Sequence, residues 1–142
     1  MTIVTVLAHL LGLALLIRLL KAGHLLARAR TAPLTLLVEA TLGLFAIHTF
    51  EIWLYAAVYV ELGALSDFET ALYLSTISYA SVGYGDVLLP NSWRILGGIE
   101  GVTGVLMLGW STAFLVSLIA QLRLLSHDWL TPAAPRETGR ES

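Results

Sequence analysis

The chain has 142 residues, of which 57% are hydrophobic and only 13% are charged, and its mean hydropathy is +0.80. Soluble domains carry about a quarter charged residues, so the composition predicts one small membrane-embedded domain. The net charge is −2, and the sequence contains no basic patch that would favour binding to nucleic acid. The absence of cysteine excludes disulfides, thiolate metal sites and cysteine nucleophiles.

Three apolar stretches are long enough to cross a hydrocarbon core, which takes about 20 helical residues. They run from about residue 3 to 20, from 33 to 62 and from 93 to 125. The first stretch could be a signal peptide, but its basic residues Arg18 and Lys21 follow the apolar run, and no A-x-A-like cleavage site follows. We therefore expect a retained N-terminal helix, spanning or interfacial, within a segment 1–30 that ends in a basic cytoplasmic connection.

The distribution of basic residues predicts the orientation. Seven of the eight lie on two connections that would share one side: Arg18, Lys21, Arg28, Arg30, Arg123, Arg136 and Arg140. Because positive charge marks cytoplasmic segments, we expect the C-terminus inside the cell and residues 62–92 outside, in a plasma or inner membrane. The tail 126–142 should be disordered. Four aromatic residues are expected at the outer membrane interface: Trp53, Tyr55, Tyr59 and Trp93.

Residues 67–79 form a shorter apolar run that would measure only about 20 Å as a helix and cannot cross the bilayer. Ser66 and Glu69 have capping-box spacing, which makes Ser66 the expected N-cap. We expect a re-entrant helix that enters from outside, stops midway and lets the chain return.

The stretch SYASVGYGDV at 78–87 follows this short helix. Gly83 and Gly85 tolerate positive φ, so successive residues can alternate in handedness and aim their carbonyl oxygens in one direction. Non-helical backbone persists at membrane depth only where protein buries it or where it lines a wet cavity. Four copies around an axis would form rings of oxygens that could replace the water shell of a cation.

The motif Ser81-Val82-Gly83-Tyr84-Gly85-Asp86 resembles the T-V-G-Y-G-D selectivity filter of potassium channels. With its flanking spans over residues 34–122, it is similar to the prokaryotic type of two-transmembrane, pore-loop potassium channel, here with an extra N-terminal helix. The resemblance implies an all-α membrane protein that assembles as a homotetramer in the lipid bilayer and conducts potassium ions. It implies no enzymatic activity and no organic cofactor. The implied pore domain, 31–125, contains an outer helix 33–62, a pore helix 67–79, a filter 81–86 and an inner helix 93–125.

The resemblance also implies roles for single residues. Potassium would bind the carbonyl oxygens of the filter, which are supplied by Ser81, Val82, Gly83 and Tyr84, with Gly85 completing the segment. Serine replaces the usual threonine at Ser81 and at Ser78. Gly104 would be the bending point of the inner helix and Gly109 a second candidate, while the cavity below the filter would be lined by Val105, Leu108 and Thr112.

Two departures from the family pattern concern the support of the filter. Tyr73 and Leu74 stand where many members have tryptophans, and Ile77 stands where some have a glutamate that pairs with the filter aspartate. Another group must therefore hold Asp86 and Tyr84. A weakly selective cation channel is the nearest alternative, but such channels usually lack the filter tyrosine. Too few basic residues precede residue 33 for a voltage sensor, and about 17 residues after Leu125 are too few for a ligand-binding domain.

Ionisable residues within a span are functional candidates. His48 and Glu51 share a helical face, and Glu100 lies at a similar depth in the third span. We expect these three residues to form one cluster behind the short helix, with Ser78 or Thr103 as partners, and to make conduction pH-dependent. Two alternatives remain, mutual satisfaction of polar groups between helices and a zinc site in a metal-binding subunit or metalloenzyme. The sequence identifies no partner for His9.

Overall fold

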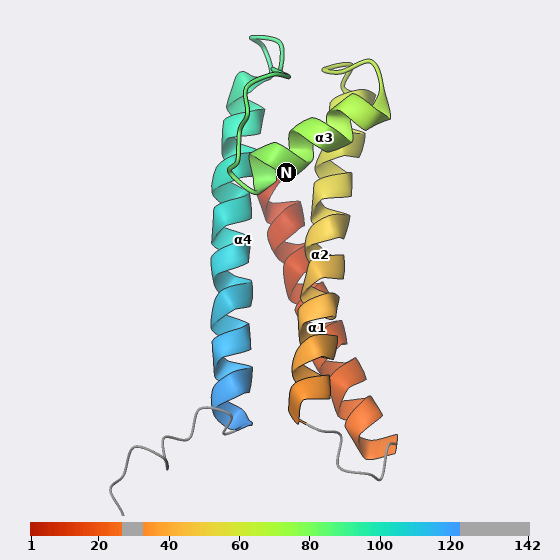
Figure 1. Cartoon of the computed structure of the whole chain (residues 1–142). Helices are drawn as coiled ribbons and strands as arrows, with labels where there is room; N and C mark the ends of the chain where they lie inside the picture. Colours follow the sequence, from red (N-terminus) through yellow and green to blue (C-terminus); the bar gives the residue numbers. More distant parts are fainter. Residues whose placement is uncertain (27–32, 123–142) are drawn as a thin grey trace, which may run out of the picture.

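The structure is a computed structural model that describes residues 1–26 and 33–122. In the order of the chain it contains four helices: α1 (Thr2–Leu26), α2 (Pro33–Glu61), α3 (Phe68–Tyr79) and α4 (Arg94–Gln121). The three long helices run alongside one another, and the short α3 lies across them at one end (Figure 1). The long helices are each apolar and long enough to cross a membrane. The expected all-α membrane architecture is therefore confirmed.

The ends of α2 follow from its sequence. Pro33 occupies the first helical position, where a residue without an N–H removes no helical hydrogen bond. Gly63 follows the last turn with a φ of 66°, a left-handed conformation that glycine adopts without strain. The N–H of Ala64 then donates to the carbonyl of Tyr59. The helix thus ends at Glu61, one residue before the expected boundary.

Asp67 is the N-cap of α3, and the expectation of Ser66 was wrong. The backbone of Asp67 is extended, and its carboxylate accepts a hydrogen bond of 2.8 Å from the N–H of Thr70. This backbone hydrogen bond lowers the pKa of Asp67. Since a charged carboxylate also interacts favourably with the positive end of the helix dipole, aspartate is the stronger of the two adjacent caps here.

The short α3 descends from the end of α2 toward the middle of the molecule, and residues 80–93 climb back to the start of α4 (Figure 1). It packs against both α2 and α4, burying Ala71, Leu74 and Ile77. Tyr55 and Tyr59 are fully buried in the same core cluster. They therefore do not anchor α2 at the membrane interface as expected, because α3 covers the face of α2 that carries them.

Gly104 lies where α4 comes closest to α3. A Cβ at this position would lie 2.1 Å from the carbonyl oxygen and 2.8 Å from the carbonyl carbon of Tyr79, the last residue of α3. Real Cβ atoms essentially never come within 3.0 Å of other heavy atoms. Gly104, expected as a hinge, thus has a packing role that sequence did not indicate. Gly109 has no such contact.

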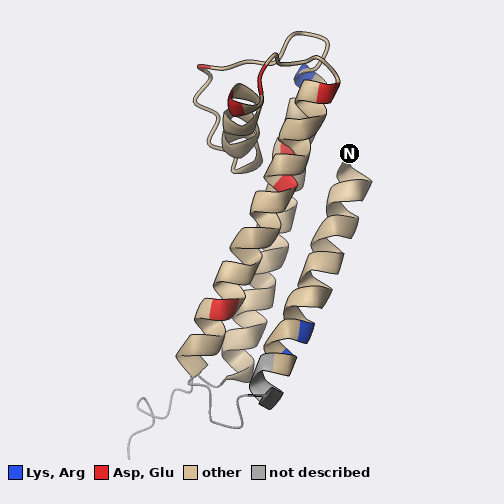
Figure 2. Ribbon diagram, turned by 90° about the vertical axis from the view of Figure 1, so that its right-hand side faces the viewer, with Lys and Arg blue, Asp and Glu red and all other residues tan. Residues whose placement is uncertain are grey.

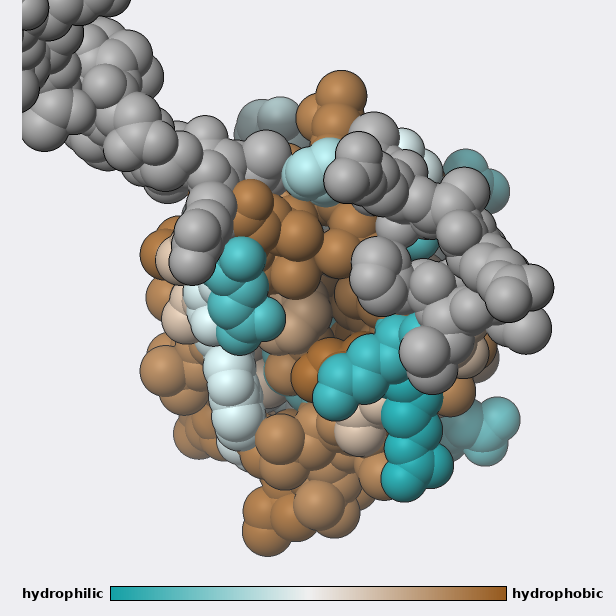
Figure 3. Space-filling view, turned by 90° about the horizontal axis from the view of Figure 1, so that it is seen from below, coloured by the Kyte–Doolittle hydropathy of each residue, from teal (hydrophilic) through white to brown (hydrophobic). Residues whose placement is uncertain are grey.

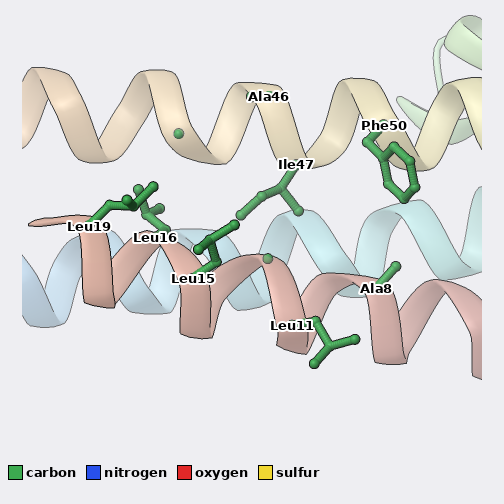
Figure 4. A pocket seen from close by; sticks show the side chains of 10 residues that line it. Ala8, Leu11, Leu15, Leu16, Leu19, Ala46, Ile47 and Phe50 are labelled. Atoms are coloured by element: carbon green, nitrogen blue, oxygen red, sulfur yellow. The ribbon is translucent and has the colours of Figure 1, made fainter.

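The first helix is antiparallel to α2 and packs on both α2 and α4 (Figure 1). Its start lies near the C-terminal end of α3. There the hydroxyl of Thr2 lies 3.4 Å from that of Thr103 on α4. Leu13 and Leu16 of α1 form a small core with Leu44 of α2. Beside this core, α1 and α2 enclose an apolar groove of about 520 Å³ (Figure 4).

The charges of the described residues are unevenly distributed. The end that holds α3 carries most of the acidic side chains, while the basic residues of α1 lie toward the opposite end (Figure 2). Seen from that opposite end, the surface is largely hydrophobic between a few hydrophilic side chains (Figure 3). Residues 27–30 of the expected basic connection, residues 123–125 of the expected inner helix and the expected disordered tail 126–142 lie outside the described residues.

Candidate functional site: the loop after α3 and its buried polar neighbours

The loop after α3 has an alternating backbone. Ser81, Gly83 and Gly85 have φ values of 57°, 51° and 79°, whereas Val82 and Tyr84 between them do not have positive φ. Left-handed conformations cost glycine nothing, but for a non-glycine residue such as Ser81 they cost about 1–3 kcal/mol. Such a conformation persists only where the surroundings hold it, so this geometry is a feature of the site.

Hydrogen bonds to the end of α3 fix this backbone. The N–H groups of Val82 and Gly83 both donate to the carbonyl of Ile77, at 2.8 and 3.1 Å, and that of Ser81 donates to the carbonyl of Ser78 at 2.9 Å. Within the described residues, no donor reaches the carbonyl oxygens of residues 81–85. The first three N–H groups of the loop are therefore directed toward α3, while its carbonyl oxygens have no donor among the described residues.

Residues 81–86 are exposed in the single chain. Tyr84 is 74% exposed and Val82 is 52% exposed. The exposed face of α4 carries Val105, Leu108, Gly109 and Thr112, the residues expected around the cavity and gate, and α1, α2 and α3 leave these residues uncovered.

A hydrogen bond of 2.7 Å from the Tyr73 hydroxyl to the Asp86 carboxylate connects the end of the loop to α3. This bond lowers the pKa of Asp86 and raises the pKa of Tyr73. Tyr73 therefore contacts Asp86 directly, and both side chains are exposed in the single chain.

A buried histidine cluster lies beside the C-terminal end of α3. It contains one or two side chains from each helix: His9 (α1), His48 and Glu51 (α2), Tyr79 (α3) and Ser111 (α4). His9, Glu51 and Tyr79 are at most 1% exposed. The cluster therefore joins all four helices directly behind the loop.

Glu51 is the centre of the histidine cluster. Its Oε1 lies 3.0 Å from Nδ1 of His9, and its Oε2 lies 3.0 Å from Nδ1 of His48 and 2.5 Å from the hydroxyl of Tyr79. Because a carboxylate only accepts hydrogen bonds, both imidazoles and the tyrosine donate to it. Nε2 of His48 bonds Ser111 at 2.9 Å, whereas Nε2 of His9 has no partner among the described residues.

Glu100 forms a second cluster, and the expectation that it joins His48 and Glu51 was wrong. Its carboxylate accepts hydrogen bonds from the hydroxyl of Tyr59 on α2 and from the hydroxyl of Ser75 on α3. The expected partners Ser78 and Thr103 do not bond it in the described residues. The two carboxylates contact different turns of α3, since Glu100 bonds Ser75 whereas Glu51 bonds Tyr79 at the end of the helix.

The histidine cluster is also where a metal ion could be held. One ligand atom each from His9, His48 and Glu51 lies within 4.8 Å of the other two. The ligand set considered from sequence included Glu100 in place of His9. Since the three groups already hydrogen-bond one another at 3.0 Å, they are satisfied without an ion.

Sequence reasoning missed several of these residues, namely His9, Tyr59, Ser75, Tyr79 and Ser111. A signal existed for His9, because a histidine in an otherwise apolar span calls for a partner. Nothing local indicated that its partner is Glu51, since the two residues are 42 positions apart.

Comparison with known proteins agrees with this geometry. No curated protein and no solved structure matches the chain. A family described as "Ion channel" matches residues 47–121, from the middle of α2 through α3 and the loop to the end of α4. Because this match covers more than half of the 142 residues, the chain belongs to the two-transmembrane, pore-loop ion channel family.

Proposed function

We propose that the protein is a potassium-selective channel that assembles as a homotetramer. Four copies of the loop would surround one axis, and potassium ions would bind between rings of carbonyl oxygens from Ser81, Val82, Gly83 and Tyr84, with Gly85 completing the segment. The observation that carries this proposal is the alternation of positive φ at Ser81, Gly83 and Gly85. Alternating handedness lets successive carbonyls face one side, which regular helix or strand does not allow.

Carbonyl rings explain both selectivity and conduction. An ion enters only if the oxygens replace its hydration shell, and it leaves because neighbouring ions in a single file repel one another. The C-terminal end of α3 adds partial negative charge near the inner end of the loop, which stabilises a cation there.

Assembly follows from the cost of leaving the loop exposed in a membrane. Each unpaired carbonyl in hydrocarbon costs several kcal/mol, so a lone protomer cannot keep residues 81–85 at membrane depth. A tetramer removes this cost, because the oxygens then face ions and water instead of lipid. The exposed Tyr84 and Val82 would pack against neighbouring subunits in the same arrangement.

The inner helix would form the cavity and the gate. Val105, Leu108 and Thr112 would line the cavity below the filter. Gly109 is the better candidate for bending, because Gly104 packs on the backbone of Tyr79 and a bend there would disturb α3.

The α3 end would face outside and the C-terminus would be cytoplasmic. In support, the basic residues of α1 lie toward the end opposite α3 (Figure 2), as the positive-inside rule requires for a cytoplasmic end. The acidic residues of the α3 end would attract cations to the mouth.

Ion flux from liposomes that contain the purified protein tests this function. Potassium efflux should exceed sodium efflux by about tenfold or more, which corresponds to about 1.4 kcal/mol of discrimination. Gly83→Ala should abolish the flux, because alanine at a φ of 51° adds about 1–2 kcal/mol of strain in each of four copies. Gly98→Ala is the matched control, since Gly98 has no positive φ and no contact within 4 Å. Equal potassium and sodium flux would contradict the proposal.

A further inference from the structure

The first helix takes part in the site although it lies outside the residues that match the ion channel family, 47–121. His9 of α1 is fully buried and lies 3.0 Å from Glu51. Its ring also packs near those of His48 and Trp110, with centroids 5.3 and 5.8 Å away. A helix that merely covered the outside of the pore would not need to bury a histidine among polar groups of the pore domain.

A short chain of hydrogen bonds leads from His9 to the filter. His9 donates to one oxygen of Glu51, and the other oxygen of Glu51 accepts from the hydroxyl of Tyr79 at 2.5 Å. Tyr79 is the last residue of α3, and the left-handed Ser81 follows two positions later. The position of the Glu51 carboxylate therefore determines where the end of α3 is held.

His9 has a distinct task among the donors to Glu51. His48 is three positions from Glu51 on the same helix, and Tyr79 belongs to the element that is being positioned. His9 approaches from α1, and among the described residues it alone bonds Oε1 of Glu51. Without it, the buried Oε1 would have no donor, and the carboxylate could turn away from Tyr79.

We propose that His9 is a positioning residue for the filter: through Glu51 it fixes Tyr79, so that α1 sets how long the filter stays conductive. This inference rests on the proposed channel function. It predicts that the filter of this chain depends on a helix outside the matched family region, and that a change on α1 alters conduction without any contact with the ion path.

The test uses the full chain, purified and reconstituted in planar bilayers, and measures the mean conducting period of single channels. His9→Leu removes the donor at similar volume and should shorten this period by about tenfold, which corresponds to about 1.4 kcal/mol. His9→Asn, whose amide nitrogen falls near the position of Nδ1, should stay within about twofold of the unmodified chain. Leu16→Ala is the control, because Leu16 packs α1 on α2 away from the histidine cluster.

A double-mutant cycle separates positioning from general destabilisation. Tyr79→Phe removes the hydroxyl at the other end of the chain of hydrogen bonds. If His9 acts through Glu51 on Tyr79, His9→Leu should have little further effect in the Tyr79→Phe background, since interacting residues are not additive. If His9→Leu fails to assemble, His9→Gln serves in its place, because its amide falls near Nε2 and misses Glu51.

Three results would overturn the inference while leaving the channel function intact: a conducting period unchanged by His9→Leu, equal losses from His9→Leu and Leu16→Ala, or additive effects of His9→Leu and Tyr79→Phe. Absence of potassium conduction by the unmodified chain would instead refute the channel function itself, so the two failures are distinguishable.

Discussion

Replacement of Gly104 by alanine tests how the proposed filter is supported. The added Cβ would lie 2.1 Å from the carbonyl oxygen of Tyr79, whereas ordinary contacts begin at 3.4 Å. The atoms that it meets belong to the backbone, so no side chain can turn aside. The end of α3 and α4 must therefore separate by at least about 1 Å.

This separation has a small effect on stability and a large effect on conduction. Overpacking costs about 1–3 kcal/mol, but alanine in place of glycine within a helix regains about 1 kcal/mol. The net loss is about 0–2 kcal/mol per protomer, and a tetramer should survive it. In the proposed channel, a shift of this size would also displace the carbonyl oxygens that bind potassium, because Tyr79 lies two residues before Ser81.

We therefore expect Gly104→Ala to form tetramers that melt at nearly the same temperature but conduct little potassium. Native electrophoresis or size-exclusion chromatography measures assembly, and liposome flux measures conduction. Gly98→Ala, on the same helix and without a contact, should conduct normally. A Gly104→Ala channel that conducts like the unmodified chain would refute the close packing of α3 on Gly104.

Two further predictions concern the polar contacts. The Tyr73 hydrogen bond favours ionised Asp86, so its support is present above the ordinary carboxyl pKa and is lost as the pH falls through the lowered pKa of Asp86. In Tyr73→Phe, acidification should begin to reduce the potassium flux at a higher external pH than in the unmodified chain. An unchanged pH profile would contradict this support. Glu100→Ala should destabilise the protomer by about 1–3 kcal/mol, because it strands the buried hydroxyl of Tyr59. In thermal melts, adding Tyr59→Phe should recover part of that loss; a further additive loss would argue against the pairing.

The unusual backbone of the loop and the order of the helices could be predicted because their determinants are local. Gly83 and Gly85 permit the unusual backbone wherever the rest of the chain lies, and hydropathy fixes the long helices. The N-cap of α3 was placed one residue early, because Ser66 and Asp67 are both good caps and only the backbone conformation distinguishes them.

The partners of the buried polar residues could not be predicted, because they depend on rotation between helices. Counting along the sequence suggested similar depths for Glu51 and Glu100, yet Glu51 bonds Tyr79 at the end of α3 and Glu100 bonds Ser75 one turn earlier. Depth can be counted along a sequence, but the direction in which a helix presents a side chain to its neighbours follows only from packing. The same holds for His9, whose partner belongs to another helix.

The reversal potential of single channels, with potassium on one side of the bilayer and sodium on the other, tests the central claim most directly. If the backbone oxygens of residues 81–84 replace the hydration shell of potassium, the reversal potential should lie at least about 59 mV from zero, with the sign that opposes potassium flow, which corresponds to tenfold or greater discrimination. A reversal potential near zero would show that these oxygens do not distinguish the two ions.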